Sequence, residues 1–266
     1  MEAKNVLVTG AAGGMGKAVC ELLTDAGYRV WGLDLTEPQE KHTWCFIHAD
    51  LTNAASVVAA RDTVLAEAGE LFAIVHMAGV YDLNSLIEMP EADWSRIFGV
   101  NLFGPYRVNR AFAPLLGQGS RVLLISSELA PLNPLPFTGV YGITKAALEK
   151  YAFSLRMELQ LLGIGVSVIR PGAIDTQILD ISTQRLDAFC QNTQLYACNA
   201  LRFRKIVDRV EARHIAPEVI AHIVQKALKA KRPRYVYNVN RNPLLLLLNA
   251  LPARLQTAII RAVLKP

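Results

Sequence analysis

Tyr141 and Lys145 lie four residues apart in the stretch VYGITKAALE, at the start of a predicted helix. Four residues make about one helical turn, so the two side chains should share one face. Tyrosine is a poor base at neutral pH because its ordinary pKa is about 10. A neighbouring ammonium group favours the phenolate, so the pair predicts a general acid–base group with an adjusted pKa.

A glycine-rich segment, VLVTGAAGGMGKAV, places Gly10, Gly14 and Gly16 between a predicted strand and a predicted helix. Glycines permit a tight turn there and let the backbone approach a pyrophosphate, which would sit at the positive end of the helix. The alternative is that the glycines only shape a turn. Their position between a strand and a helix, within the first thirty residues, favours dinucleotide binding.

Asp34 ends the second predicted strand, 18 residues after Gly16. A carboxylate at this position accepts hydrogen bonds from the adenosine ribose and repels a 2′-phosphate. The next residue is Leu35, where an arginine would suit a phosphate, and Gly13 inside the loop is uncharged. These residues favour NAD over NADP.

Short apolar runs alternate with helical patterns along the chain, and this alternation predicts a single doubly wound α/β domain with a mostly parallel, seven-stranded sheet. We expect the catalytic domain at 1–240, with a substrate lid at about 177–215, and a C-terminal extension at 241–266. The strands are expected at 4–10, 28–35, 44–51, 71–79, 120–127, 165–172 and 234–239, and the helices near 14–27, 53–68, 91–117, 140–162 and 216–230.

The motifs resemble those of the short-chain dehydrogenase/reductase family with its Rossmann fold, and in particular its hydroxysteroid and retinol enzymes. TGAAGGMG, Asp50-Leu51, HMAG, the Tyr–Lys pair and RPGAIDT follow one another in the family's order. HMAG, at 76–79, stands where the family usually has NNAG. We interpret His76 as a strand residue near the cofactor cleft because no second metal ligand has a suitable spacing.

The resemblance implies a catalytic set of Tyr141, Lys145, Ser127 and Asn101. Ser127 would donate a hydrogen bond to the substrate oxygen, and Asn101 would hold a water that connects Lys145 to solvent. The family's serine usually lies about thirteen residues before the tyrosine. Ser127 lies 14 residues before Tyr141. The residue thirteen positions before Tyr141 is Glu128, which falls after the end of the predicted strand and is therefore not the expected catalytic residue. Ser126 remains the alternative to Ser127.

The resemblance also implies the cofactor contacts. Asp50 would bind the adenine amino group, Lys145 the nicotinamide ribose, and Thr176 with the main chain at Ile174 the carboxamide. The full set is Gly10, Gly14, Met15, Gly16, Asp34, Asp50, Leu51, Ala78, Gly79, Tyr141, Lys145, Pro171, Gly172, Ile174 and Thr176.

Cysteine usage and apolar runs indicate the compartment. The four cysteines show no C-x-x-C pairing, so neither a disulfide scaffold nor a zinc site is expected, and no metal is predicted. The N-terminus lacks a secretory pattern, and no run reaches about 18 uninterrupted apolar residues. A cytoplasmic protein is expected.

The C-terminal quarter is basic and leucine-rich. Residues 201–266 carry 14 Lys/Arg and 3 Asp/Glu, whereas the first 200 residues carry 14 and 20. No base-reading motif accompanies this charge, so nucleic acid is not an expected partner. The segment 243–265 could instead lie on a membrane surface, pack on a subunit or close over the pocket. The resemblance implies a homodimer or homotetramer.

These observations predict an NAD(H)-dependent oxidoreductase that interconverts a lipophilic secondary alcohol and its ketone, with Tyr141 as the general acid–base group. Two alternatives stay open. One is an NADP-dependent carbonyl reductase, and the other is a dinucleotide-binding regulator without turnover.

Overall fold

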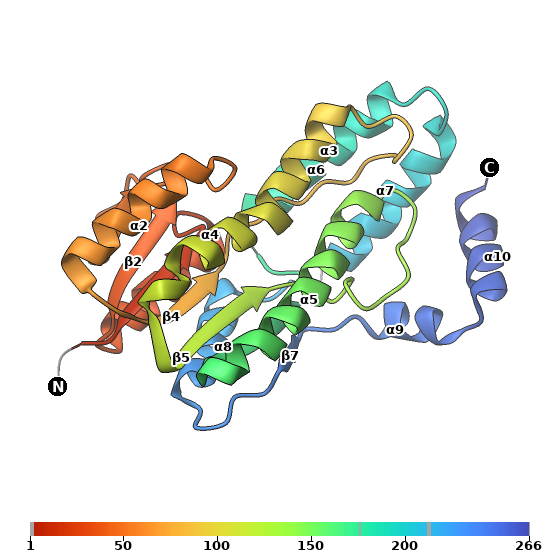
Figure 1. Cartoon of the computed structure of the whole chain (residues 1–266). Helices are drawn as coiled ribbons and strands as arrows, with labels where there is room; N and C mark the ends of the chain where they lie inside the picture. Colours follow the sequence, from red (N-terminus) through yellow and green to blue (C-terminus); the bar gives the residue numbers. More distant parts are fainter. Residues whose placement is uncertain (1–2, 176, 212–213, 266) are drawn as a thin grey trace.

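A sheet of seven parallel strands forms the centre of the protein (Figure 1). The computed structural model describes residues 3–175, 177–211 and 214–265. The strand order is β3-β2-β1-β4-β5-β6-β7, and the predicted doubly wound α/β fold is confirmed. The strands are β1 (Asn5–Thr9), β2 (Arg29–Asp34), β3 (Cys45–His48), β4 (Leu71–His76), β5 (Leu116–Ile125), β6 (Gly165–Pro171) and β7 (Val236–Val239).

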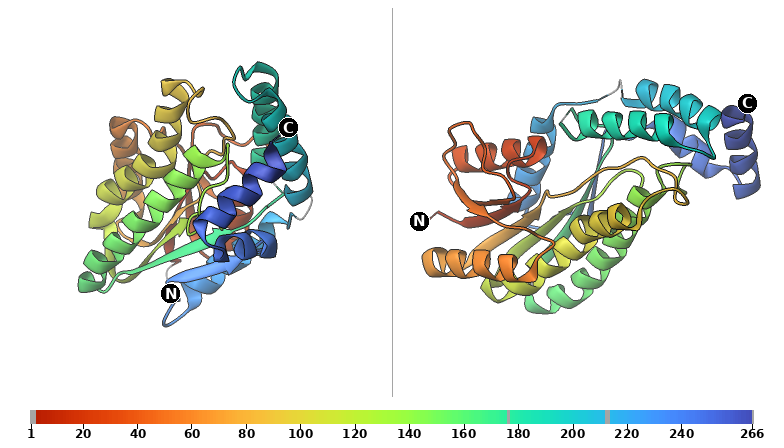
Figure 2. Two further views of the ribbon diagram at one scale, coloured as in Figure 1. Left: turned by 90° about the vertical axis from the view of Figure 1, so that its right-hand side faces the viewer. Right: turned by 90° about the horizontal axis from the view of Figure 1, so that it is seen from above.

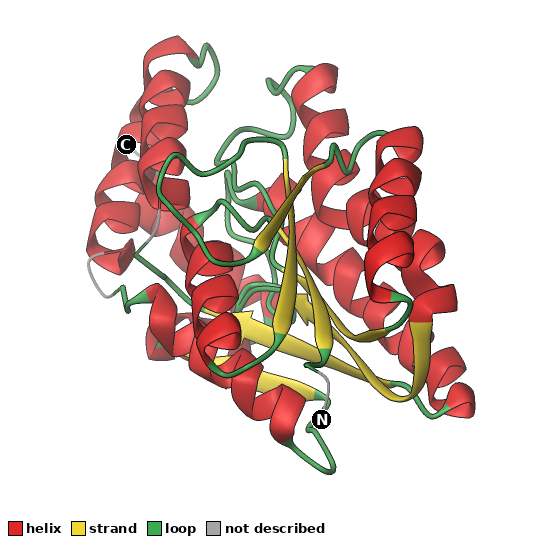
Figure 3. Ribbon diagram, turned by 90° about the vertical axis from the view of Figure 1, so that its left-hand side faces the viewer, coloured by secondary structure: helices red, strands yellow, loops and turns green. Residues whose placement is uncertain are grey.

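Helices lie on both faces of this sheet (Figure 3). Short 3₁₀ turns follow two of the helices, at Ala113–Leu115 and Gln160–Leu162. The α-helices are α1 (Gly14–Asp25), α2 (Ala54–Ala68), α3 (Glu91–Phe98), α4 (Gly104–Phe112), α5 (Gly139–Leu159), α6 (Gln177–Asn192), α7 (Ala197–Glu211), α8 (Pro217–Lys229), α9 (Pro243–Ala250) and α10 (Ala253–Leu264).

Strand β1 shows why the sheet needs helices on both sides. Successive side chains of a strand point to opposite faces. Val6 and Val8 join the apolar core that contains residues of α1 and α8, whereas Leu7 joins the core that contains residues of α2 and α4. All three are fully buried. A strand that is apolar at every position can bury all its side chains only between two layers of helix.

The helix predicted over 91–117 is interrupted, so that expectation was wrong. Helix α3 ends at Phe98, one π-helical turn spans Gly99–Phe103, and α4 follows. Strand β5 then begins at Leu116, inside the range predicted as helical. A π turn inserts an extra residue and is frequent at functional sites. Here it contains Asn101, which is buried.

The segment predicted as a lid, 177–215, contains the helices α6 and α7. Their buried side chains form one apolar cluster with the loop after β4, the loop before α5 and the end of α10. Its members are Leu83, Phe137, Leu186, Phe189, Ala200, Phe203 and Leu264. Figure 2 shows α9 and α10 beside these helices, at the end of the molecule far from the N-terminus. None of the described helices is long and apolar enough to cross a membrane.

His76 ends β4 as a buried side chain inside a polar chain of hydrogen bonds. Its Nε2 lies 2.9 Å from Oδ1 of Asn109, and Nδ2 of Asn109 donates to the hydroxyl of Tyr151 at 3.0 Å. Burial lowers the pKa of His76 to about 4, because the imidazolium form loses its hydration. Among the described residues, no group of three or more His, Cys, Asp or Glu side chains could hold a metal ion.

Replacing His76 with glutamine should reduce the acid sensitivity of the fold. The unfolded chain protonates this residue near pH 6.5, whereas the folded protein keeps it neutral down to about pH 4. Between these values the unfolded state binds more protons, so stability falls as the pH decreases. The wild type should lose about 3 kcal/mol more than His76→Gln between pH 7 and pH 4. Urea unfolding at both pH values measures this, and equal losses would contradict it.

Candidate active site

The glycine loop after β1 has the geometry of a cradle for a bound group. Gly10 has a φ of +69°, and a Cβ atom there would lie 2.6 Å from backbone atoms of Ala78. A Cβ atom on Gly16 would lie 1.9 Å from the carbonyl oxygen of Gly10. The N-cap of α1 is Gly13, which provides no side-chain cap. The first backbone N–H groups of α1 are therefore suited to a phosphate.

Asp34 is held beside this loop at the end of β2. Its Oδ2 accepts a hydrogen bond from the N–H of Ala12 at 2.9 Å, and its Oδ1 accepts one from the N–H of Leu35 at 2.7 Å. The carboxylate is therefore fixed in orientation by the loop it adjoins. The structure thus brings the glycine turn and Asp34, the predicted ribose-binding acid, together at the carboxyl ends of the parallel strands.

Asp50 and Leu51 follow the carboxyl end of β3, on the same side of the sheet as Asp34. Oδ1 of Asp50 accepts from both the N–H and the hydroxyl of Thr52, at 2.8 and 2.7 Å. Leu51 is buried and belongs to the core beneath α2 and α4. In the structure, Asp50 therefore stabilises the turn before α2, and its contact with adenine stays a prediction.

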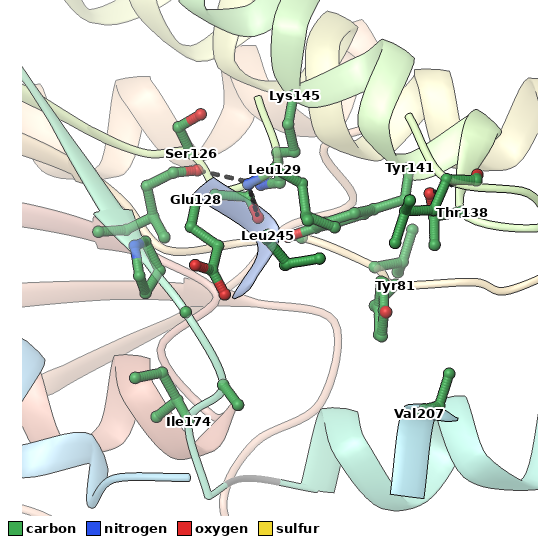
Figure 4. A pocket seen from close by; sticks show the side chains of 18 of the residues that line it. Tyr81, Ser126, Glu128, Leu129, Thr138, Tyr141, Lys145, Ile174, Val207 and Leu245 are labelled. Carbon is green, nitrogen blue, oxygen red and sulfur yellow. Dashed lines mark hydrogen bonds between the residues drawn. The ribbon is translucent and has the colours of Figure 1, made fainter. Parts of the chain in front are cut away.

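Tyr141 and Ser127 both line one pocket, in which Figure 4 shows Tyr141 and Lys145 on the same helix. The Ser127 side chain is close enough to the phenol of Tyr141 to lower its pKa, and its Oγ accepts from the N–H of Leu129 at 3.1 Å. Ser126 instead donates its hydroxyl to Glu149 at 2.8 Å. The geometry therefore places Ser127, rather than Ser126, beside the tyrosine hydroxyl.

Lys145 lies one turn after Tyr141 in α5 and is almost fully buried. Its Nζ donates to the carbonyl oxygen of Ile125 at 3.0 Å and lies 5.6 Å from the centre of the Tyr141 ring. A Cβ atom on Gly79 would lie 3.4 Å from this Nζ. The glycine at position 79 therefore leaves the space that the ammonium group occupies.

Asn101 is held by three hydrogen bonds to the chain after β4 and to α5. Its Nδ2 donates to the carbonyl of Val80 at 2.9 Å and to the hydroxyl of Thr144 at 3.1 Å, and its Oδ1 accepts from the N–H of Val80 at 2.8 Å. Asn101 therefore fixes the chain after β4 against α5. A water relay from Asn101 to Lys145 stays a prediction.

Burial sets the pKa values of the Tyr–Lys pair. It raises the pKa of Tyr141 to about 12, and the nearby Ser127 side chain opposes this only in part. It lowers the pKa of Lys145 to about 8. We expected the lysine to bring the pKa of the tyrosine down toward neutrality, and in the protein alone this was wrong. Both shifts oppose charge, because the pocket withholds water from both groups.

The turn after β6 forms another part of the pocket wall, through Pro171, Gly172 and Ile174. A Cβ atom on Gly172 would lie 2.0 Å from the carbonyl oxygen of Asn240, so only glycine fits at this crossing. Ile174 forms an isolated parallel bridge with Ile215. Thr176, predicted to hold the carboxamide, lies outside the described residues. Met15 and Gly79 also line the pocket.

Several pocket residues were not foreseen from the motifs. Tyr81 contacts the edge of the Tyr141 ring, with centroids 4.6 Å apart, and it lies only two residues after the HMAG turn. Glu128 lines the pocket, and burial raises the pKa of its carboxyl. Its Oε2 accepts from the N–H of Asn242 at 2.6 Å. The apolar lining is completed by residues from three further segments, namely Leu129, Leu135, Phe203, Ile206, Val207 and Leu245.

Comparison with known proteins agrees with this geometry. A family model for the short chain dehydrogenases matches residues 4–186. The chain is 26% identical over 236 residues to a 3-ketodihydrosphingosine reductase of Bacteroides thetaiotaomicron, covering 88% of this chain and 87% of the relative. It is 28% identical over 263 residues to the mouse estradiol 17-beta-dehydrogenase 2, covering 91% of this chain and 69% of the relative.

Solved structures share the fold. A short-chain dehydrogenase/reductase of Burkholderia phymatum in complex with NAD has a TM-score of 0.74 at 23% identity, covering 88% of this chain and 89% of that one. A short-chain dehydrogenase of Burkholderia cenocepacia in complex with NADP has a TM-score of 0.71 at 21% identity, covering 100% of this chain and 99% of that one. The protein described here belongs to the short-chain dehydrogenase family. It is an oxidoreductase with a dinucleotide-binding fold.

Replacing Ser127 with alanine should lower kcat by roughly 10²–10³-fold, the usual effect of removing one hydrogen-bond donor to a developing oxyanion. Ser126→Ala is the matched control, because the Ser126 hydroxyl is bonded to Glu149. Its kcat should stay near the wild-type value. Steady-state kinetics with any substrate that the wild type turns over measures both, and a larger loss in Ser126→Ala would reverse the assignment.

Proposed function

We propose that this protein is an NAD(H)-dependent oxidoreductase that interconverts a lipophilic secondary alcohol and its ketone, with Tyr141 as the general acid–base group. One observation carries the proposal. Tyr141 and Ser127 line the same mainly apolar pocket, close enough for Ser127 to lower the pKa of the phenol, with the buried ammonium of Lys145 one helical turn away. A binding module without turnover has no need for this arrangement.

The proposed chemistry assigns one task to each side chain. Nicotinamide, when bound, supplies the carbon that accepts or gives the hydride. In the oxidation direction, the substrate hydroxyl loses its proton to the phenolate of Tyr141. In the reduction direction, the phenol of Tyr141 returns that proton to the ketone oxygen. Ser127 donates a hydrogen bond to the same oxygen as charge develops on it.

The high pKa of Tyr141 in the protein alone makes the phenol the resting form, and this form suits reduction. Oxidation requires the phenolate, which positive charge nearby would favour. Lys145 supplies one such charge, and the oxidised nicotinamide ring would supply a second. The groups of the protein alone therefore favour the phenol, and an oxidised nicotinamide would shift this balance toward the phenolate.

A Tyr141→Phe variant tests this mechanism directly. Removing a general acid–base group should lower turnover by roughly 10²–10⁴-fold, whereas NAD should still bind, as followed by fluorescence or calorimetry, because the other expected cofactor contacts are unchanged. The assay should use steroid, retinoid and long-chain secondary alcohols with NAD and with NADP. A short polar alcohol is the control, and good turnover of it alone would reject a lipophilic substrate.

Two outcomes of that panel would favour the alternatives. NAD that binds without turnover of any alcohol or ketone would point to a dinucleotide-binding regulator. Turnover that requires NADP would point to a carbonyl reductase. The relatives' names support the lipophilic proposal, since two of them describe a sphingoid ketone and a steroid alcohol. Neither name identifies this chain's substrate.

The preference for NAD rests on Asp34 and its neighbour Leu35. A double variant, Asp34→Ser/Leu35→Arg, removes the negative charge and adds a positive one where a 2′-phosphate would lie. The ratio of kcat/KM values for NAD and NADP should move toward NADP by about 100-fold, because a like-charge contact costs several kcal/mol. Leu35→Arg alone is the control and should move the ratio less. An unchanged ratio in the double variant would contradict the assignment.

A homodimer or homotetramer is part of the proposal, and its supporting surface lies on α4, α5 and the π turn before α4. Large apolar side chains there are exposed, although the same helices bury their other faces in the core. They are Phe103, Tyr106, Ile143, Phe153 and Met157. A second copy of the chain would cover this face through contact of like helices.

A further inference from the structure

The two C-terminal helices expose a second apolar surface, distant in the sequence from α4 and α5. Leu244 and Leu247 in α9 are 66% and 65% exposed. In α10, Leu255, Ile259 and Val263 are also exposed. These three are spaced four residues apart, so they form one stripe along the helix.

The inner sides of the same helices are firmly attached to the protein. Leu245 lines the active-site pocket, and Leu264 packs into the cluster of the lid helices. Gln256 is buried, and its Oε1 accepts from Nδ2 of Asn133 at 3.1 Å. Asn249 accepts from the N–H of Asn133 at 2.8 Å. The outward leucines are therefore a fixed feature of the folded chain and not the result of a loose end.

The beginning of α9 is joined to the active-site loop. Glu128, next to the proposed catalytic serine, accepts from the N–H of Asn242, and Oδ1 of Asn242 caps α9 through the N–H of Leu244 at 2.9 Å. Leu244 and Leu245 are neighbours in sequence, with the first exposed and the second in the pocket wall. The exposed surface and the pocket are thus separated by the thickness of one helix.

The lid helix α7 has the same two-sided character. Phe203, Ile206 and Val207 line the pocket, whereas Leu201 is 52% exposed. Figure 2 shows α7 and α10 next to each other at one end of the molecule, and they are in contact. Together, α7, α9 and α10 carry exposed leucines over the part of the protein that encloses the pocket.

Positive charge borders this surface. Arg254, Arg261 and Lys265 line a shallow groove along a third face of α10. Residues 219–266 contain no Asp or Glu, although they contain nine Lys and Arg. An amphipathic helix with an apolar stripe and a basic face is suited to the interface of an anionic bilayer. Long basic side chains there reach the headgroups while their stems stay on apolar surface.

We infer that α7, α9 and α10 form a docking surface for an anionic lipid bilayer, from which the substrate enters the pocket. A second copy of the chain fits this surface poorly. A two-fold contact through α10 would set its basic faces near each other, and α9 and α10 contain no acidic residue to pair with them. The entry route rests on the proposed lipophilic substrate, whereas the docking surface does not.

The test uses the full chain and sedimentation with vesicles of phosphatidylcholine and phosphatidylglycerol at 3:1, beside vesicles of phosphatidylcholine alone. The wild type should bind the anionic vesicles at least tenfold more strongly, and high salt should weaken this binding. Leu244→Gln/Leu247→Gln should reduce binding at least tenfold. These side chains are exposed and outside the pocket lining, so NAD binding and thermal unfolding should stay unchanged.

Leu161→Gln/Leu162→Gln is the matched control, because this leucine pair is also exposed, at 82% and 64%, but follows α5. It should bind vesicles like the wild type. Equal loss in both double variants, or a wild type that stays in the supernatant with anionic vesicles, would overturn the proposal. If Leu244→Gln/Leu247→Gln converted a dimer of the wild type into a monomer in the absence of lipid, the surface would belong to a contact with a second copy instead.

Turnover separates this inference from the proposed function. A lipophilic alcohol supplied in anionic vesicles should be oxidised at least severalfold faster by the wild type than by Leu244→Gln/Leu247→Gln, whereas both should act equally on the same alcohol in detergent micelles. Vesicle binding without any turnover would reject the proposed alcohol chemistry and leave the docking surface standing. Equal rates from vesicles would reject the entry route.

Discussion

The burial of the Lys145 ammonium is the constraint on which the rest of the site depends. A buried cation needs hydrogen-bond partners, and the structure supplies the carbonyl oxygen of Ile125 at 3.0 Å. That carbonyl is at the end of β5, while Gly79 leaves room for the ammonium after β4. The lysine therefore fixes α5 against the ends of two neighbouring strands, and Tyr141 takes its place one turn earlier on the same helix.

Asn101 completes this junction from a third element. Its three hydrogen bonds to Val80 and Thr144 join the π turn to the chain after β4 and to α5. A regular helix over the same residues would present its side chains at a different angle, so the irregular turn is what directs the amide inward. Positioning in this site thus comes from backbone groups as much as from the side chains that we propose for the chemistry.

The pocket around the junction is enclosed by segments that the sheet does not itself position. The lid is held to the chain after β4 by two carboxylates. Asp82 pairs with Arg185 and lies 3.6 Å from Arg96, while Glu88 accepts from the N–H of Gln194 at 2.8 Å. Phe137, with a φ of 65°, packs against aromatic rings of both lid helices. The position of α6 and α7 over the pocket therefore depends on contacts between residues far apart in the sequence.

By itself, the sequence determined the strands, most helices, the glycine turn and the Tyr–Lys pair. These features follow from local rules: apolar runs, glycine at a forced close approach, and a spacing of one helical turn. Most bounds of the elements agree with the expected ranges to within a few residues.

Only the tertiary structure decided the remaining features. It placed Ser127 rather than Ser126 at the tyrosine, because the direction of each hydroxyl depends on partners 14 and 23 residues away. It interrupted the helix at Asn101, and it let burial, rather than the neighbouring lysine, set the pKa of Tyr141. It also divided the leucines of α9 between pocket and surface. Each of these outcomes depends on which distant segments pack together, and no local spacing contains that information.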